Sequence, residues 1–199
     1  MDPRGYELRA VHGHLLAHAR APAPIHGQIQ GQSQGQSHAL ASILATWSCG
    51  GGALPAWLGL GADGFAALLC HHFPGAWVRP RPQAPGIDPR RSAEIGDLRD
   101  LMLAHRAGRS VSEEWTAGIV ASACMGADHL WQDLGLWSRP DLTTLLYANF
   151  PGLACANAHD MKWKKFLYRQ LCAAQHLRVC RAPSCEVCVD YADCFGSED

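Results

Sequence analysis

DHLWQDLGLWSRPDLTTLLYANF, residues 128–150, is the segment of this 199-residue chain that most clearly shows how it folds. Its first half places Leu130, Trp131 and Leu134 on one face of a helix. Pro140 then begins a second helix as its N1 residue, because proline lacks the N–H that the first turn leaves unpaired. No segment of the chain shows convincing alternation of apolar and polar residues, as a half-buried strand would. The pattern predicts an all-α fold.

Further helices are predicted upstream by the same spacing of apolar residues and by their capping signals. They cover residues 3–20, 39–47, 63–73 and 92–107, and one more begins near Ser112. Glycines end two of them, at residues 50–52 and at Gly108. Ser92 and Ser112 are predicted N-caps, the latter with Glu113 and Glu114 in the first turn.

Two segments are predicted to lack regular structure. IHGQIQGQSQGQSH (25–38) is too polar and too rich in glycine to bury a surface, so we expect a flexible linker. Prolines break the segment 78–91, which predicts a long surface loop. The expected organisation is therefore an N-terminal helix and linker (1–38), followed by a single helical domain (39–199) that ends in an irregular cysteine-rich loop. In the first helix, which we expect at the periphery, the apolar face is Leu8, Val11, Leu15 and Leu16.

Charge and hydrophobicity exclude several classes of protein. The formal net charge is −1, which provides no overall basic field for nucleic acid. No run of about 18 apolar residues predicts a membrane span, and the N-terminus lacks the apolar stretch of a signal peptide. We therefore expect a cytoplasmic protein. In that compartment thiols stay reduced, so the nine cysteines favour metal binding over disulfides.

Four of the nine cysteines lie within CRAPSCEVCVDYADC (180–194). Cys180, Cys185, Cys188 and Cys194 have the spacing C-x4-C-x2-C-x5-C, so one loop supplies four thiolates to one metal centre. Structural zinc usually takes two C-x2-C pairs, and only one such pair is present. The spacing therefore favours an iron–sulfur centre and leaves zinc as an alternative.

A basic row precedes this loop. If residues 160–176 form a helix, Lys162, Lys165, Arg169, Cys172 and His176 share one face. The opposite, apolar face is Trp163, Phe166, Leu167, Leu171 and Ala174. We expect the apolar face to pack on the core and the basic row to face solvent, where it would attract an anion such as molybdate or a thiolate-bound cluster. The alternative is an ordinary solvated helix face.

Several motifs in this half of the chain resemble the NifQ family of nitrogen-fixation proteins. The resemblance covers about residues 115–196 and rests on HLWQDLGL (129–136), MKWKKF (161–166), YRQLC (168–172), APSCEVC (182–188) and CFG (194–196), with Asn157. It implies a metal carrier without enzymatic activity, which holds molybdenum with an iron–sulfur cluster, either 4Fe-4S or a Mo-Fe-S derivative. Cys180, Cys185, Cys188 and Cys194 would ligate that cluster.

The resemblance also implies partners. Molybdenum would come from molybdate or a molybdenum-storage or uptake source and would be donated to biosynthesis of the nitrogenase iron–molybdenum cofactor. The recipient would be the cofactor-assembly scaffold with its associated nitrogenase iron protein. We expect Cys172, His176, Lys162, Lys165 and Arg169 to form a molybdenum or oxyanion site, and neither nucleic acid nor a membrane to be a partner.

The competing interpretation is a zinc-stabilised helical module for protein interaction. A cysteine-nucleophile enzyme has little support, because no Cys/His/Asn arrangement is recognisable. The histidines at 12, 14, 18, 71 and 72 are expected in surface or packing roles. Cys49, Cys70, Cys124 and Cys155 are expected to be small buried hydrophobic residues, with Cys155 and Cys172 as candidates for a fifth ligand.

Overall fold

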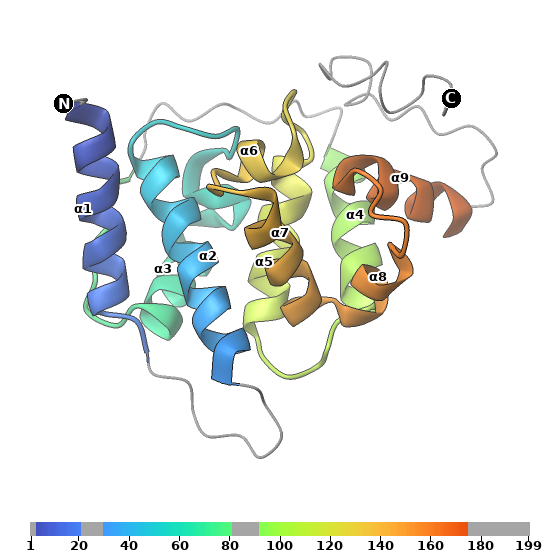
Figure 1. Cartoon of the computed structure of the whole chain (residues 1–199), viewed down its shortest axis with the longest axis horizontal. Coiled ribbons are helices and arrows are strands. Elements are labelled where there is room, and N and C mark those ends of the chain that lie inside the picture. The colour runs from blue at the N-terminus through green and yellow to red at the C-terminus, as the bar shows by residue number, and fades with distance from the viewer. Residues whose placement is uncertain (1–2, 21–29, 81–91, 175–199) are drawn as a thin grey trace.

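The computed structural model describes residues 3–20, 30–80 and 92–174 of the chain (Figure 1). All regular structure in these ranges is helical, so the predicted all-α fold is confirmed. The helices are α1 (Pro3–Ala17), α2 (Gln30–Ser48), the short 3-10 helix η1 (Ala56–Gly59), α3 (Gly61–His72), α4 (Ser92–Ala104), α5 (Ser112–Ala123), α6 (Leu130–Leu134), α7 (Arg139–Asn149), α8 (Pro151–Ala156) and α9 (Trp163–Ala174).

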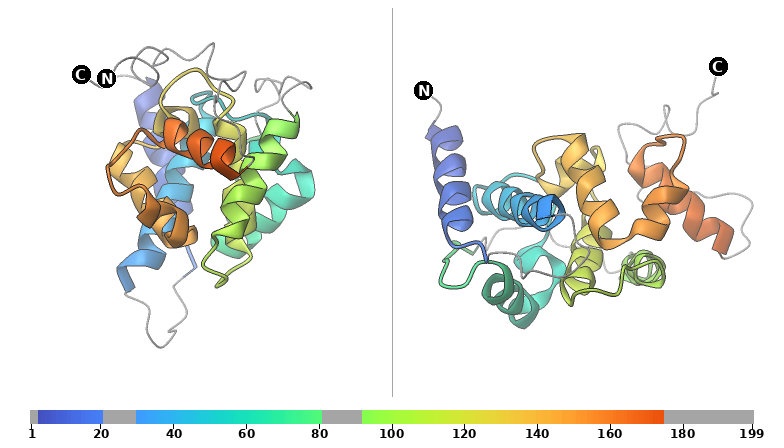
Figure 2. Two further views of the ribbon diagram at one scale, coloured as in Figure 1. Left: turned by 90° about the vertical axis from the view of Figure 1, so that its right-hand side faces the viewer. Right: turned by 60° about the horizontal axis from the view of Figure 1, so that its bottom comes forward.

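The helices form one packed body around an apolar core. α1 packs on α2, α2 on α7, and α4 on both α5 and α9. Figure 1 shows α1 at one end of the molecule and α4, α8 and α9 at the other, and Figure 2 shows α9 lying beside α4 from two further directions. Fully buried side chains come from most of the helices and include Leu15, Ile43, Trp47, Leu68, Leu98, Ile119, Leu145 and Leu167. α9 is thereby held at one end of a continuous core.

Most predicted helices are present, with small shifts at their ends. α2 ends before Gly50, whose φ of 88° is the left-handed conformation that glycine adopts freely. α4 ends at Ala104 and not near Ala107, because the N–H groups of His105 and Arg106 bond to carbonyls three residues back. α7 begins at Arg139, one residue before Pro140, and Ser138 caps it by accepting the Asp141 N–H at 3.3 Å.

The prediction of a flexible linker is wrong for residues 30–38, which form the first half of α2. One reason is that Gln36 is half-buried and paired: its Nε2 donates to Ser112 Oγ at 2.8 Å and to Asn149 Oδ1 at 3.0 Å. Another is that a Cβ on Gly35 would lie 3.1 Å from the Thr144 side chain, so glycine lets α2 approach α7 closely. Gly35 and Gln36, which belong to the segment that suggested a spacer, are suited to this contact. Residues 25–29 of the predicted linker and residues 81–91 of the predicted loop lie outside the described residues.

Ser112 was expected to cap α5, and this is also wrong. Ser112 is the first residue of α5, and its buried hydroxyl hydrogen-bonds to His72 Nε2 at 2.6 Å as well as to Gln36. The turn before α5 is held by Glu113, whose carboxylate accepts the N–H groups of Gly108 and Arg109, both at 2.8 Å. Ser112 is thus free to join α2, α3 and α5 through one hydroxyl group.

The predicted N-terminal helix is confirmed as α1, and the expected face is the one that packs. Leu15 is fully buried, while Val11 and Leu16 are partly buried against the core. His12 is also buried, with its ring between the rings of His38 and Trp137, at centroid distances of 5.1 and 4.4 Å. Burial lowers the pKa of His12, and the nearby His38 lowers it further. α1 therefore belongs to the packed body.

A buried ion pair connects α9 to α6. Lys164 Nζ contacts Asp133 Oδ2, and it also donates to the carbonyl oxygens of Gly126, at 2.9 Å, and Asp128. The exposed fractions of the Lys164 and Asp133 side chains are 11% and 3%. Burial raises the pKa of Asp133, and the ammonium group of Lys164 opposes that rise. Three acceptors satisfy the three N–H bonds of the ammonium group.

None of the helices in the described part of the chain is long and apolar enough to cross a membrane.

His72 should make the stability of the fold depend on pH. It is 9% exposed, and burial lowers its pKa from 6.5 to about 4, with His71 and Arg20 as further causes. Between these values the unfolded chain binds the proton and the folded chain does not, so the free energy of unfolding falls as the pH falls. The loss reaches about 3 kcal/mol across this window at 1.36 kcal/mol per pH unit. Urea unfolding of His72→Gln should lack this component, while His159→Gln, at an exposed position, should retain it. Equal pH slopes in wild type and His72→Gln would show that His72 is not buried in neutral form.

Lys164→Met should be strongly destabilising. It leaves the Asp133 carboxylate buried without its cation, which costs about 3–5 kcal/mol. The matched control is Arg106→Met, which removes an exposed ion pair with Glu114 (3.1 Å) and should cost less than about 1 kcal/mol. Urea unfolding of both variants measures the difference. A loss of the same small size in both variants would contradict a buried ion pair.

Candidate metal centre

The segment before α9 is fixed by side chains that bond to its backbone. Asn157 Oδ1 accepts the Met161 N–H at 2.9 Å, and its Nδ2 donates to the Met161 carbonyl at 3.0 Å. Arg139 Nη2 donates to both the carbonyl and the carboxylate of Asp160, each at 2.8 Å. Asp160 has a φ of 51°, which reverses the chain just before the helix. These bonds set where α9 starts and in which direction it runs.

The apolar face of α9 packs largely as expected. Trp163, Phe166 and Leu167 are buried, whereas Leu171 is half-buried and Ala174 is exposed, so the predicted face is wrong at its last residue. Tyr168, which was not singled out from the sequence, is also buried, and its hydroxyl bonds to Glu94 in the first turn of α4. α9 is therefore attached to α6 through Lys164 and to α4 through Tyr168.

The basic row is only partly exposed. The Lys162 carbonyl accepts the Phe166 N–H at 2.9 Å, which extends the helical row back to Lys162. Lys162 and Lys165 are half-buried, and Arg169 is exposed. Cys172 is only 9% exposed, so its predicted position on a solvent-facing surface is wrong. It faces inward because it follows Tyr168 by four residues, on the side of α9 that packs.

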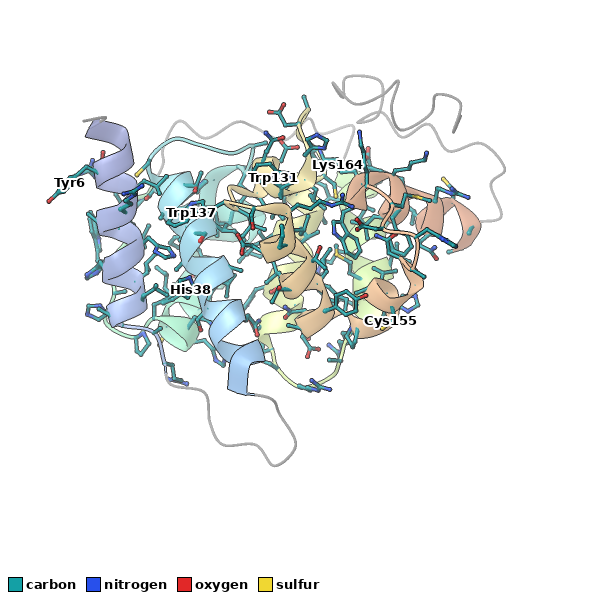
Figure 3. All side chains as sticks on the ribbon, viewed as in Figure 1. Tyr6, His38, Trp131, Trp137, Cys155 and Lys164 are labelled. Atoms are coloured by element: carbon teal, nitrogen blue, oxygen red, sulfur yellow. The ribbon has the colours of Figure 1, made fainter. Side chains whose placement is uncertain are left out.

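Lys164 lies within MKWKKF (161–166), but unlike Lys162 and Lys165 it does not belong to the predicted basic row. Figure 3 labels it at the upper end of α9. Its charge is matched by Asp133, which the sequence analysis did not connect with it. Sequence spacing cannot reveal a pair 31 residues apart that forms only when α6 and α9 meet. The basic residues of the predicted row on this helix segment are Lys162, Lys165 and Arg169.

The four cysteines of the predicted metal loop, together with His176, lie outside the described residues. Within the ranges that are described, no group of three or more His, Cys, Asp or Glu side chains is arranged to hold a metal ion. The predicted ligands Cys180, Cys185, Cys188 and Cys194 therefore stay a prediction. The last described residues, at the end of α9, are six residues before the first of them.

The other cysteines divide into two groups. Cys124 is buried, as expected, and Cys49 is half-buried, where burial raises its thiol pKa. Cys70 and Cys155 are exposed, so the expectation of burial is wrong for both, since each lies on the outward side of its helix. Figure 3 shows Cys155 on α8, at the opposite end of this region from Lys164. Cys172 is disulfide-bonded in this structure, so it offers no thiolate there, whereas the role of Cys155 as a fifth ligand stays a prediction.

The buried histidines have packing roles, as expected. His72 bonds to Ser112, and His12 packs against His38 and Trp137. His129 lies just before α6, where its N–H donates to Gln132 Oε1 at 3.3 Å. None of these rings belongs to a group of potential metal ligands in the described part of the chain.

Comparison with known proteins covers the helical body and the cysteine loop together. The family model described as NifQ matches residues 39–196. Protein NifQ of Azotobacter vinelandii is 44% identical over 156 residues, which are 73% of this chain and 80% of that protein. Protein NifQ of Rhodobacter capsulatus is 39% identical over 162 residues, 80% of this chain and 87% of that protein.

A shorter match, 49% identical over 80 residues, is to Protein NifQ of Klebsiella pneumoniae and covers 40% of this chain and 48% of that protein. No solved structure gives a significant match. The family match extends across all four cysteines of the loop and the whole of α9. On this evidence the chain belongs to the NifQ family of nitrogen-fixation proteins.

Proposed function

We propose that this protein is a metal carrier that holds an iron–sulfur cluster on Cys180, Cys185, Cys188 and Cys194. Its cargo is molybdenum, which it donates to biosynthesis of the nitrogenase iron–molybdenum cofactor. The observation that carries the proposal is the family match over residues 39–196, which includes the four cysteines and α9 in one continuous region.

The donor set suits the proposed cluster. Four thiolates within fifteen residues, without a second C-x2-C pair, are the ligand type that iron–sulfur clusters take. When bound, the cluster supplies sulfur ligands and negative charge; thiolate and sulfide are soft donors that retain metals which water and carboxylates release. The exposed cysteines Cys70 and Cys155 stand apart from this loop in the sequence and are not needed for it.

The side chains of α9 support an approach by an oxyanion. Lys162, Lys165 and Arg169 carry three positive charges, and the ion pair with Asp133 keeps Lys164 out of this set. Each cation at about 6 Å from an anion contributes roughly 3 kcal/mol at an effective dielectric near 20, and less where water screens it. Molybdate would therefore be attracted to this side of α9 first, and the thiolate-bound centre that follows α9 in the sequence would retain the metal.

The partners follow from the same proposal. Molybdenum would enter as molybdate or from a storage or uptake protein, and the recipient would be the cofactor-assembly scaffold with the nitrogenase iron protein. Moving a metal from one protein to another is not turnover of a substrate, so the proposed role is that of a cytoplasmic carrier and not of an enzyme. Its transfer surface would include the exposed end of α9, because Arg169 and Ala174 lie there in contact with solvent.

Metal analysis of the anaerobically purified chain tests the proposal. The wild type should contain about four irons with matching sulfide and show broad absorption near about 400 nm. Cys188→Ala should lose this iron, because one of four ligands is removed. Cys70→Ala is the matched control, since it removes an exposed thiol on α3, and its iron content should stay at the wild-type level.

A second pair of variants tests the oxyanion face separately. Lys165→Met with Arg169→Met should reduce molybdenum loading while the iron content is retained. If protein made with ample iron and sulfide contains zinc and no iron, the iron–sulfur proposal fails, and the zinc-stabilised interaction module replaces it. If Cys188→Ala keeps its iron, the cluster ligands are elsewhere.

A further inference from the structure

A cavity of about 350 Å³ lies between α1, the end of α2 and the extended residues that follow α3. Its volume is near the lower end of the range for small-molecule sites, which is about 300–1,000 Å³. The residues that line it are Glu7, Ala10, Val11, His14, Ser48, Trp77, Val78 and Arg79. The helix α1, which supplies four of these residues, lies at the end of the molecule opposite α9 (Figure 1), and the cavity shares no residue with the proposed metal centre.

The two walls of the cavity are tied to each other. The Trp77 N–H donates to His14 Nε2 at 3.4 Å, which joins the extended segment to α1. Arg79 Nη1 and Glu7 Oε1 are 3.7 Å apart, so the charged side chains meet across the same boundary. These contacts join two elements that are far apart in the sequence.

The lining is mainly apolar, with one charge of each sign. Ala10, Val11 and Val78 supply the aliphatic surface, and the indole of Trp77 is 66% exposed. An aromatic side chain of this size is normally buried, and leaving it in water forgoes much of the free energy that its burial would contribute. The exposed indole is therefore surface that a ligand would cover.

The two charges disfavour simple anions and simple cations as ligands of this cavity. A phosphate or a carboxylate near Arg79 would be repelled by Glu7, and an amine near Glu7 would be repelled by Arg79. A ligand that carries both charges meets both partners. The Glu7 and Arg79 side chains are 55% and 71% exposed, so their own ion pair is weak and exchanging it for ligand groups costs little.

We propose that this cavity binds a small zwitterion, an α-amino acid with an apolar or aromatic side chain. Arg79 takes its carboxylate, Glu7 takes its ammonium group, and the side chain lies on Val11, Val78 and Trp77. Five of the eight lining residues lie on α1 and α2, and the other three follow α3. Four of the eight precede residue 39, where the family match begins. The site is therefore independent of metal loading and goes beyond the proposed function.

Calorimetric titration of the full chain with L-phenylalanine and L-leucine tests the site. We expect saturable binding with one site per chain. N-acetyl-L-phenylalanine, which lacks the ammonium group, and L-phenylalaninamide, which lacks the carboxylate, should each bind at least about tenfold more weakly, because each leaves one charged partner unmatched.

Variants assign the binding to this cavity. Arg79→Met and Glu7→Gln should each weaken binding of L-phenylalanine about tenfold, and Ala10→Leu should abolish it by filling the cavity without changing a charge. Arg106→Met, which breaks the exposed pair with Glu114, is the matched control and should bind as wild type does. Circular dichroism confirms that each variant is folded.

Absence of saturable binding would overturn the proposal. So would equal binding of the amino acid and its two blocked forms, which would mean that the cavity recognises apolar surface alone. Unchanged affinity in Ala10→Leu would place any binding elsewhere on the chain. None of these results bears on the iron content of the protein, so the proposed metal carrier stands or fails separately.

Discussion

Asp133 is the residue on which most of the C-terminal half depends. Its carboxylate holds the ammonium group of Lys164, and its carbonyl accepts the Ala53 N–H at 2.8 Å, so one residue connects α9, α6 and the segment after α2. The surrounding backbone is close: a Cβ on Gly126 would lie 2.3 Å from the carboxylate, and one on Gly52 would lie 2.9 Å from the carbonyl. Glycines at these two positions allow a charged residue to be enclosed by backbone, and a full-size side chain would push the enclosing segments apart.

A second buried polar group, the Ser112 hydroxyl, connects helices from the N-terminal half in a similar way. It meets His72 and Gln36, and Gln36 continues to Asn149, so α2, α3, α5 and α7 share one hydrogen-bonded chain. Apolar packing tolerates small slips between helices, whereas a buried hydrogen bond does not, because each unmatched polar group costs about 1–3 kcal/mol. The two polar centres therefore define the register in which the apolar helices pack.

The parts of the fold that could be predicted from sequence are those set by neighbouring residues. The C-terminal end of α2 follows from Gly50, and the start of α7 lies one residue before the predicted Pro140. Most of the packed face of α9 follows from its helical spacing. The parts that could not be predicted depend on distant partners, such as the pairing of Lys164 with Asp133 and the burial of Cys172. The family could be recognised because its motifs are local. The ligand loop after α9, predicted from the same motifs, lies outside the described residues.

The helical form of residues 30–38 has a consequence for the order in which the chain folds. The glycines of this segment lower its tendency to form a helix alone, since each glycine costs about 1 kcal/mol relative to alanine. Gln36 is synthesised well before Ser112 and Asn149, which are 76 and 113 residues further along the chain. We therefore expect the first half of α2 to acquire its structure late, when α5 and α7 are in place, although it leaves the ribosome early. Contacts this distant in sequence slow folding, because the chain between them must be closed into a loop first.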